Sequence, residues 1–87
     1  MYKFEFASTK SCTNFDKHGI NFIAAQELWT DPDFIQVKAK SDGEQRYLVI
    51  GIMAEKHWSA VITYRDDIIR IISVRRSRKA EVSLYES

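Results

Sequence analysis

Five cationic side chains lie close together in the last quarter of the chain, between positions 70 and 79, and no acidic residue interrupts them. An arginine side chain is a planar fork that binds two phosphate oxygens at once and keeps its charge at physiological pH. A cluster of this kind beside a predicted strand can bind a phosphodiester and stabilise the negative charge that develops on it. Its members are Arg70, Arg75, Arg76, Arg78 and Lys79.

Strand periodicity divides these arginines. Side chains alternate between the two faces of a regular strand, so Arg70 and Arg75 point to opposite sides unless a bulge intervenes. Arg75 and Arg76 lie where the chain leaves the sheet, and we expect them to share a cleft. Arg70 is expected to orient a neighbour or to contact a protein partner. A solvated basic surface without a ligand is the alternative interpretation.

Lys17 and His18 are candidates for proton transfer. A neutral imidazole near pH 7 can act as a general base. Because Gly19 follows, the same residues also suit an ordinary helix C-terminus, where cations and a left-handed glycine are favourable.

Two further candidates for proton transfer lie later in the chain. Glu44 is two residues before Arg46, so the pair could flank a substrate or form an ordinary surface ion pair. Tyr85 lies four residues after Glu81 on a predicted helix, and both are expected to project over the basic cluster. The histidines and the cysteine show no paired metal-ligand spacing, and the glycines are isolated. No metal and no cofactor are predicted.

Length and composition indicate a single globular domain over residues 1–87. The net charge is only +1, but without the five clustered cations eight basic residues oppose twelve acidic ones. The charge is therefore segregated, and a local basic region can attract a polyanion. The lone Cys12 suits a reducing compartment, and no apolar run is long enough to cross a membrane. We expect a cytoplasmic protein without membrane contact.

The apolar periodicity predicts an α+β fold. A strand over 2–6 is followed by a helix that starts at Ser8 or Thr9 and ends near Lys17, with Cys12 and Phe15 on its buried side. A second helix, capped by Asn21 and ended by Asp31-Pro32, carries an apolar stripe of Phe22, Ala25, Leu28 and Trp29.

Four strands are predicted over 34–39, 46–54, 57–65 and 68–74, with short turns at 40–43, at Glu55-Lys56 and at Asp66-Asp67. Short turns imply an antiparallel meander. A last helix is predicted over 77–85, with Ser77 as its cap. The expected architecture is two N-terminal helices on one face of a small, mainly antiparallel sheet of four to five strands, followed by a short C-terminal helix.

Several short motifs occur in a characteristic order. Phe4-Glu5-Phe6 and Asn14 precede Lys17-His18-Gly19-Ile20-Asn21-Phe22, and Asp31, Glu44-x-Arg46, Ile50-Gly51 and Tyr64 come next. The run from Ile69 to Arg76 follows, and Glu81 and Tyr85 come last. In this order and spacing the chain resembles the BrnT family, the toxin half of bacterial BrnT–BrnA type II toxin–antitoxin systems. It departs at Phe6-Ala7-Ser8 and Ile23-Ala24-Ala25, where the family commonly has Trp-Asp-Pro and Glu-Glu-Ala.

The resemblance implies a RelE-like fold, growth arrest by ribonuclease activity and neutralisation by a cognate BrnA-like antitoxin. RNA is the expected substrate, free or on the ribosome, and operator DNA is contacted only through the antitoxin. For metal-independent cleavage we expect a phosphate clamp of Arg70, Arg75 and Arg76, with proton transfer among Lys17, His18, Glu44 beside Arg46, and Tyr85. Arg75, Arg76, Arg78 and Lys79 would bind RNA. The alternative is a non-catalytic binding module whose basic surface receives an acidic protein or nucleic acid.

Overall fold

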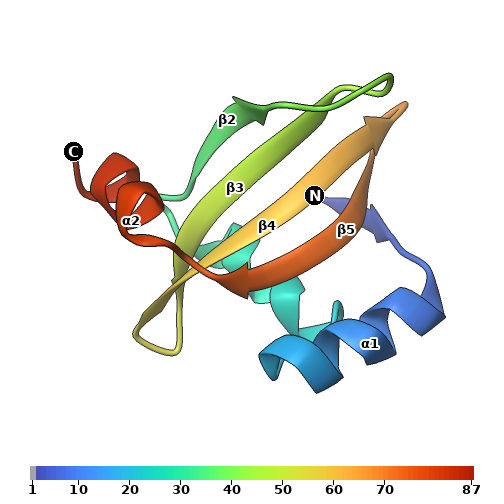
Figure 1. The fold of residues 1–87 in the computed structure, drawn as a ribbon, viewed down its shortest axis with the longest axis horizontal. Helices are drawn as coiled ribbons and strands as arrows, with labels where there is room; N and C mark the ends of the chain where they lie inside the picture. The colour runs from blue at the N-terminus through green and yellow to red at the C-terminus, as the bar shows by residue number, and fades with distance from the viewer. Residues whose placement is uncertain (1) are drawn as a thin grey trace.

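The computed structural model describes residues 2–87 and contains a five-stranded sheet in the order β1-β5-β4-β3-β2 (Figure 1). Strands β2 to β5 form the predicted antiparallel meander, and β1 pairs with β5 in parallel at one edge. The predicted mainly antiparallel sheet is thereby confirmed. The strands are β1 (Lys3–Glu5), β2 (Ile35–Ala39), β3 (Arg46–Met53), β4 (Lys56–Arg65) and β5 (Ile68–Arg76).

The turn between β3 and β4 lies one residue earlier than predicted. Ala54 and Glu55 form it, with φ angles of 50° and 66°. A two-residue hairpin of this hand needs positive φ at both positions, which Asn-Gly usually supplies. The sequence Ala-Glu gives no such signal, so the prediction of Glu55-Lys56 was wrong.

The 3₁₀ helix η1 (Ala24–Thr30) packs on one face of the sheet, whereas helix α1 (Ser8–His18) lies along the edge formed by β5 (Figure 1). The prediction of two helices on one face is therefore confirmed for η1 and wrong for α1. The predicted stripe of the second helix is confirmed, although the helix is 3₁₀ rather than α. Asn21 Oδ1 accepts a hydrogen bond of 2.8 Å from the Ala24 amide, as a residue at a helix start can. The core on this face includes Phe22, Ala25, Leu28, Trp29, Val49, Ala60, Ile62, Ile69, Ile71 and Val74.

The buried side of α1 is polar, which corrects the prediction of Cys12 and Phe15. Both of these residues are exposed, whereas Ser11 and Asn14 are buried. Strand β1 pairs with β5 only as far as Arg70, so backbone groups further along that edge need other partners.

Asn14 supplies these partners. Its Nδ2 donates to the carbonyls of Val74 (2.9 Å) and Ile20 (2.8 Å), and its Oδ1 accepts from the Val74 amide (3.1 Å). The side-chain amide thus takes the place of a neighbouring strand and fixes α1 along β5. The helix ends at Gly19 in the left-handed conformation (φ 77°), as predicted, but Ala7 precedes its first turn in place of a serine or threonine cap.

Replacing Asn14 by alanine is expected to lower the free energy of unfolding by about 3 kcal/mol, because buried backbone groups of Val74 and Ile20 lose their partners. Urea denaturation measures the change. Thr13→Ala, at an exposed position on the same helix, is the matched control. Equal losses in the two variants would contradict the role assigned to the Asn14 amide.

A β-bulge in β5 changes which arginines share a face. Val61 pairs with Ser73 and Ile62 pairs with Ile71, so Ile72 is an extra residue. Arg70 then lies opposite Thr63, and Arg75 lies opposite Ser59. Thr63 and Ser59 are four residues apart on β4, so both arginines lie on the face opposite to η1, which we call the second face. The predicted separation of Arg70 from Arg75 was therefore wrong.

Helix α2 (Lys79–Glu86) covers one end of the second face, where it contacts Ser59. The short C-terminal helix is thus confirmed, but Ser77 does not cap it. Arg78 occupies the cap position, and its amide donates to Glu81 Oε1 at 2.9 Å.

Candidate functional site

Arg75 and Glu81 form a bidentate ion pair. Its Nη1 and Nη2 each lie 2.7 Å from one oxygen of the carboxylate. Glu81 Oε1 also accepts hydrogen bonds from Ser59 Oγ (2.8 Å) and the Arg78 amide (2.9 Å). The bonds from Arg75 first, and then those from the Arg78 amide and Ser59, lower the pKa of Glu81 to about 2. The bond and charge of Glu81 in turn raise the pKa of Arg75. Glu81 and Tyr85 were both predicted to project over the basic cluster. The prediction is confirmed for Glu81 and wrong for Tyr85, whose hydroxyl contacts Asp31 instead.

Arg70 and Arg46 also lie on the second face. Arg70 Nη1 donates to Glu5 Oε2 at 2.8 Å, and both side chains are partly exposed. Arg46 shares its side of β3 with Ile50, whose partner on β4 is Ser59. The structure therefore brings three arginines to one face, and two of them are held by carboxylates.

Arg76 points away from this group. It is paired with Trp58 on the helix-covered face, and its guanidinium lies 5.7 Å from the centre of the indole ring. Arg78 and Lys79 are exposed at the start of α2. The predicted cleft shared by Arg75 and Arg76 is thus not formed.

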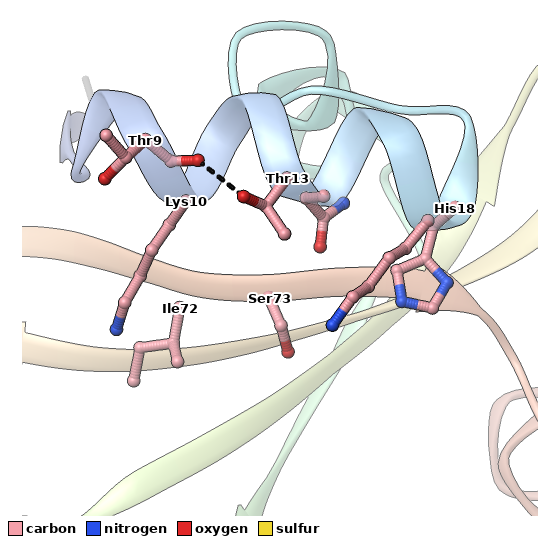
Figure 2. A pocket seen from close by; sticks show the side chains of 8 residues that line it. Thr9, Lys10, Thr13, His18, Ile72 and Ser73 are labelled. Atoms are coloured by element: carbon pink, nitrogen blue, oxygen red, sulfur yellow. Dashed lines mark hydrogen bonds between the residues drawn. The ribbon is translucent and has the colours of Figure 1, made fainter.

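Lys17 and His18 border a groove between α1 and the edge of β5 (Figure 2). Its volume is about 260 Å³. The groove is lined by Thr9, Lys10, Thr13, Asn14, Lys17, His18, Ile72 and Ser73. Because Ile72 and Ser73 belong to the bulged segment of β5, the groove lies beside the stretch that carries Arg70 and Arg75.

Glu44 lies at the other end of the sheet. It precedes β3, and its Oε2 is 3.9 Å from Arg65 Nη2, at the last residue of β4. Ser59, which contacts the Arg75–Glu81 pair, lies near the first residue of β4. The expected pairing of Glu44 with Arg46 is replaced by a loose, exposed contact with Arg65, and the structure does not bring Glu44 to Arg75.

Tyr85 anchors α2 to the loop after η1. Its hydroxyl donates to Asp31 Oδ2 at 2.7 Å, and this bond, burial and the Asp31 charge raise the pKa of Tyr85 to about 12. Burial alone would raise the pKa of Asp31, but hydrogen bonds from Tyr85 and from the amides of Asp33 and Ile52 lower it. On the same helix Glu86 Oε2 lies 2.9 Å from His57 Nε2. Tyr85 therefore holds its proton and contributes to the docking of α2.

Sequence reasoning did not identify Lys10, Ser59 or Ser73 as site residues. Lys10 lies on the same flank of α1 as Lys17, and the helical spacing of seven residues is a signal that could have found it. Ser59 and Ser73 carry no such signal, because their positions depend on strand register.

Within residues 2–87, no group of three or more histidine, cysteine or acidic side chains is arranged to hold a metal ion. The same part of the chain has no helix with the length and apolar character that a membrane span requires.

The fold and this arrangement define a small α+β protein whose basic side chains gather along one bulged strand. A family model described as the ribonuclease toxin BrnT of type II toxin–antitoxin systems matches residues 6–81. The chain belongs to this BrnT family of ribonuclease toxins. A search among curated proteins finds no match.

Proposed function

We propose that this toxin cuts RNA without a metal ion, at the bulged segment of β5, and that a cognate BrnA-like antitoxin neutralises it. The bulge at Ile72 carries the proposal. It places Arg70 and Arg75 on one face with Ser73 between them along the strand, and Ser73 also lines the groove of Lys17 and His18. Phosphate-binding and proton-transferring groups thus flank the same short segment.

The reaction that fits these groups is an internal transesterification of RNA. His18 takes the proton of a ribose 2′-hydroxyl, whose oxygen attacks the adjacent phosphorus. The bond from phosphorus to the 5′-oxygen breaks, and Lys17 gives a proton to that leaving oxygen. The products are a 2′,3′-cyclic phosphate and a free 5′-hydroxyl.

Arg70 and Arg75 stabilise the charge on the pentacoordinate phosphate. Glu81 occupies two of the five N–H donors of Arg75, and the Arg76 carbonyl lies 3.3 Å from Nη1. Nε and the second hydrogen of Nη2 stay free for a phosphate oxygen. Glu5 and Glu81 therefore orient the two guanidinium groups and leave them able to bind a ligand.

Cleavage of a labelled RNA by the purified toxin tests the proposal. We expect equal rates with and without EDTA, and growth arrest when the toxin is expressed without its antitoxin. Arg70→Gln is expected to reduce cleavage about 10²-fold, because one donor to the transition state is lost. Arg65→Gln, at an exposed arginine at the far end of β4, is the matched control and should cut at the parent rate.

Loss of cleavage in EDTA with recovery on adding Mg²⁺ would overturn the metal-independent mechanism. Equal rates for Arg70→Gln and Arg65→Gln would remove Arg70 from it. A folded protein that binds RNA but neither cuts it nor arrests growth would be a binding module.

A further inference from the structure

We propose that the groove between α1 and β5 binds the sugar–phosphate backbone of single-stranded RNA next to the cut site, with Lys17 at the scissile phosphate and Lys10 on a neighbouring one. The inference deepens the proposed function and rests on it for the position of the cut. To the proposed site it adds a subsite for the RNA backbone and a residue, Lys10, that takes no part in the reaction itself.

The spacing on α1 fits an extended strand of nucleic acid. Lys10, Thr13 and Lys17 recur at helical spacing on the flank that faces β5. Figure 2 shows Lys10 and Ile72 towards one end of the groove and His18 at the other, with Ser73 of β5 between them. Seven residues of helix rise by about 10 Å, so the distance between the two lysines is larger than a single phosphate group. A backbone that runs parallel to α1 therefore meets both.

The charge of the groove favours a polyanion. Its lining holds two lysines, a histidine and three hydroxyl side chains, with no acidic residue. This bias is local, because the whole chain has 13 basic and 12 acidic residues. Among residues 2–87, neither lysine forms an ion pair, so both ammonium groups are free to bind phosphate.

The opposite flank of α1 has a different character. A hollow there is lined by Phe6, Cys12, Phe15 and Ile23, among others, and its one charged residue is Asp16. The two flanks of one helix thus offer an apolar surface and a cationic one. The cationic flank is the one that lies beside the bulge, His18 and the proposed cut site, which favours RNA over an acidic protein segment as its occupant.

Hydrogen bonds join the two walls of the groove. The three hydrogen bonds of Asn14 to Val74 and Ile20 tie the middle of α1 to β5, so both walls keep their spacing without a ligand. Preformed walls reduce the ordering cost of binding. A volume of about 260 Å³ suits an extended backbone, and it lies below the range of pockets that enclose whole drug-sized molecules.

The salt dependence of RNA binding tests the groove. The probe is a short fluorescent RNA with 2′-O-methyl groups, which cannot undergo the transesterification, and anisotropy gives its affinity at several salt concentrations. Lys10→Gln is expected to reduce the slope of log K against log salt by about 0.7, the value for one lost phosphate contact on a single strand. In cleavage assays the same variant should raise KM and leave kcat unchanged, because uniform binding is lost. Lys38→Gln, at an exposed lysine on β2, is the matched control.

Equal salt slopes for Lys10→Gln and Lys38→Gln would overturn the subsite, even if the protein cuts RNA. A loss of antitoxin affinity with an unchanged RNA slope would also overturn it and assign the groove to an acidic protein segment. Conversely, a slope that depends on Lys10 in a protein that cuts no RNA would support the groove and contradict the ribonuclease mechanism. The two proposals therefore fail in different ways.

Discussion

Replacing His18 by glutamine is expected to slow RNA cleavage by about 10²- to 10⁴-fold, the usual contribution of a general base. Glutamine can form hydrogen bonds but cannot accept the 2′-hydroxyl proton near neutral pH. His18 is exposed at the last residue of α1, so the variant should keep the fold. Single-turnover cleavage rates of the parent and the variant measure the loss.

His57→Gln is the matched control, because His57 is the other histidine of the chain. Its Nε2 lies 2.9 Å from Glu86 on α2, a contact that glutamine can retain. We expect the control to cut at nearly the parent rate. If the His18 variant kept the parent rate, or if both variants lost the same fraction of the rate, His18 would not be the base.

Features whose signal lies within one element could be predicted from the sequence. The stripe of Phe22, Ala25, Leu28 and Trp29 reports burial directly, because each of its members meets the same core. Gly19 marked the end of α1 because a left-handed residue is needed there. The short turns between successive strands predicted the antiparallel order, because a short turn can join only neighbouring strands that run in opposite directions.

The bulge could not be predicted, because both faces of β5 are apolar at that point. Ile71 and Ile72 are the same residue type, so a shift of one position leaves the apolar pattern unchanged. That shift nevertheless decides whether Arg75 lies on the same face of the sheet as Arg70. The strand itself was therefore predictable, whereas the grouping of Arg70 with Arg75 was not.

The buried side of α1 was mispredicted for a different reason. A search for apolar spacing selects Cys12 and Phe15, but this helix packs against the open edge of β5, where backbone groups need hydrogen bonds. Asn14 and Val74 are 60 positions apart in the chain, and no local pattern can indicate such a pair. Polar residues on a helix are thus ambiguous until the neighbouring strand edge is known.

Glu81→Gln is expected to lower the free energy of unfolding by roughly 3 kcal/mol near pH 7. The pKa of Glu81 is about 2 in the folded protein, against an ordinary value of 4.5, and that difference corresponds to roughly 3 kcal/mol. A carboxylate whose pKa is lower in the folded state stabilises the protein at pH values above its pKa in the unfolded state. This stabilisation is lost as the pH falls through its pKa in the folded state. Parent stability should therefore decline between about pH 5 and pH 2, and this part of the decline should be absent in the variant.

Urea denaturation over a pH series measures the change in stability, and Glu86→Gln on the same helix is the matched control. The Glu86 side chain is 58% exposed, so its contact with His57 should contribute less than about 1 kcal/mol. Equal losses for the two variants, or an unchanged acid decline in Glu81→Gln, would contradict the role given to the Arg75–Glu81 pair.

The same pair allows the structural and catalytic roles of Arg75 to be separated. Arg75→Gln alone should cost roughly 3–5 kcal/mol, because the Glu81 carboxylate stays largely buried without its partner. The double variant Arg75→Gln/Glu81→Gln removes both charges, so its loss of stability should be smaller than the sum of the two single losses.

Cleavage by two of these variants tests the catalytic role, because Glu81→Gln keeps the Arg75 guanidinium and the double variant lacks it. If Arg75 binds the reacting phosphate, cleavage should fall about 10²-fold between these two folded proteins. Equal cleavage by both would restrict Arg75 to holding α2 on the sheet.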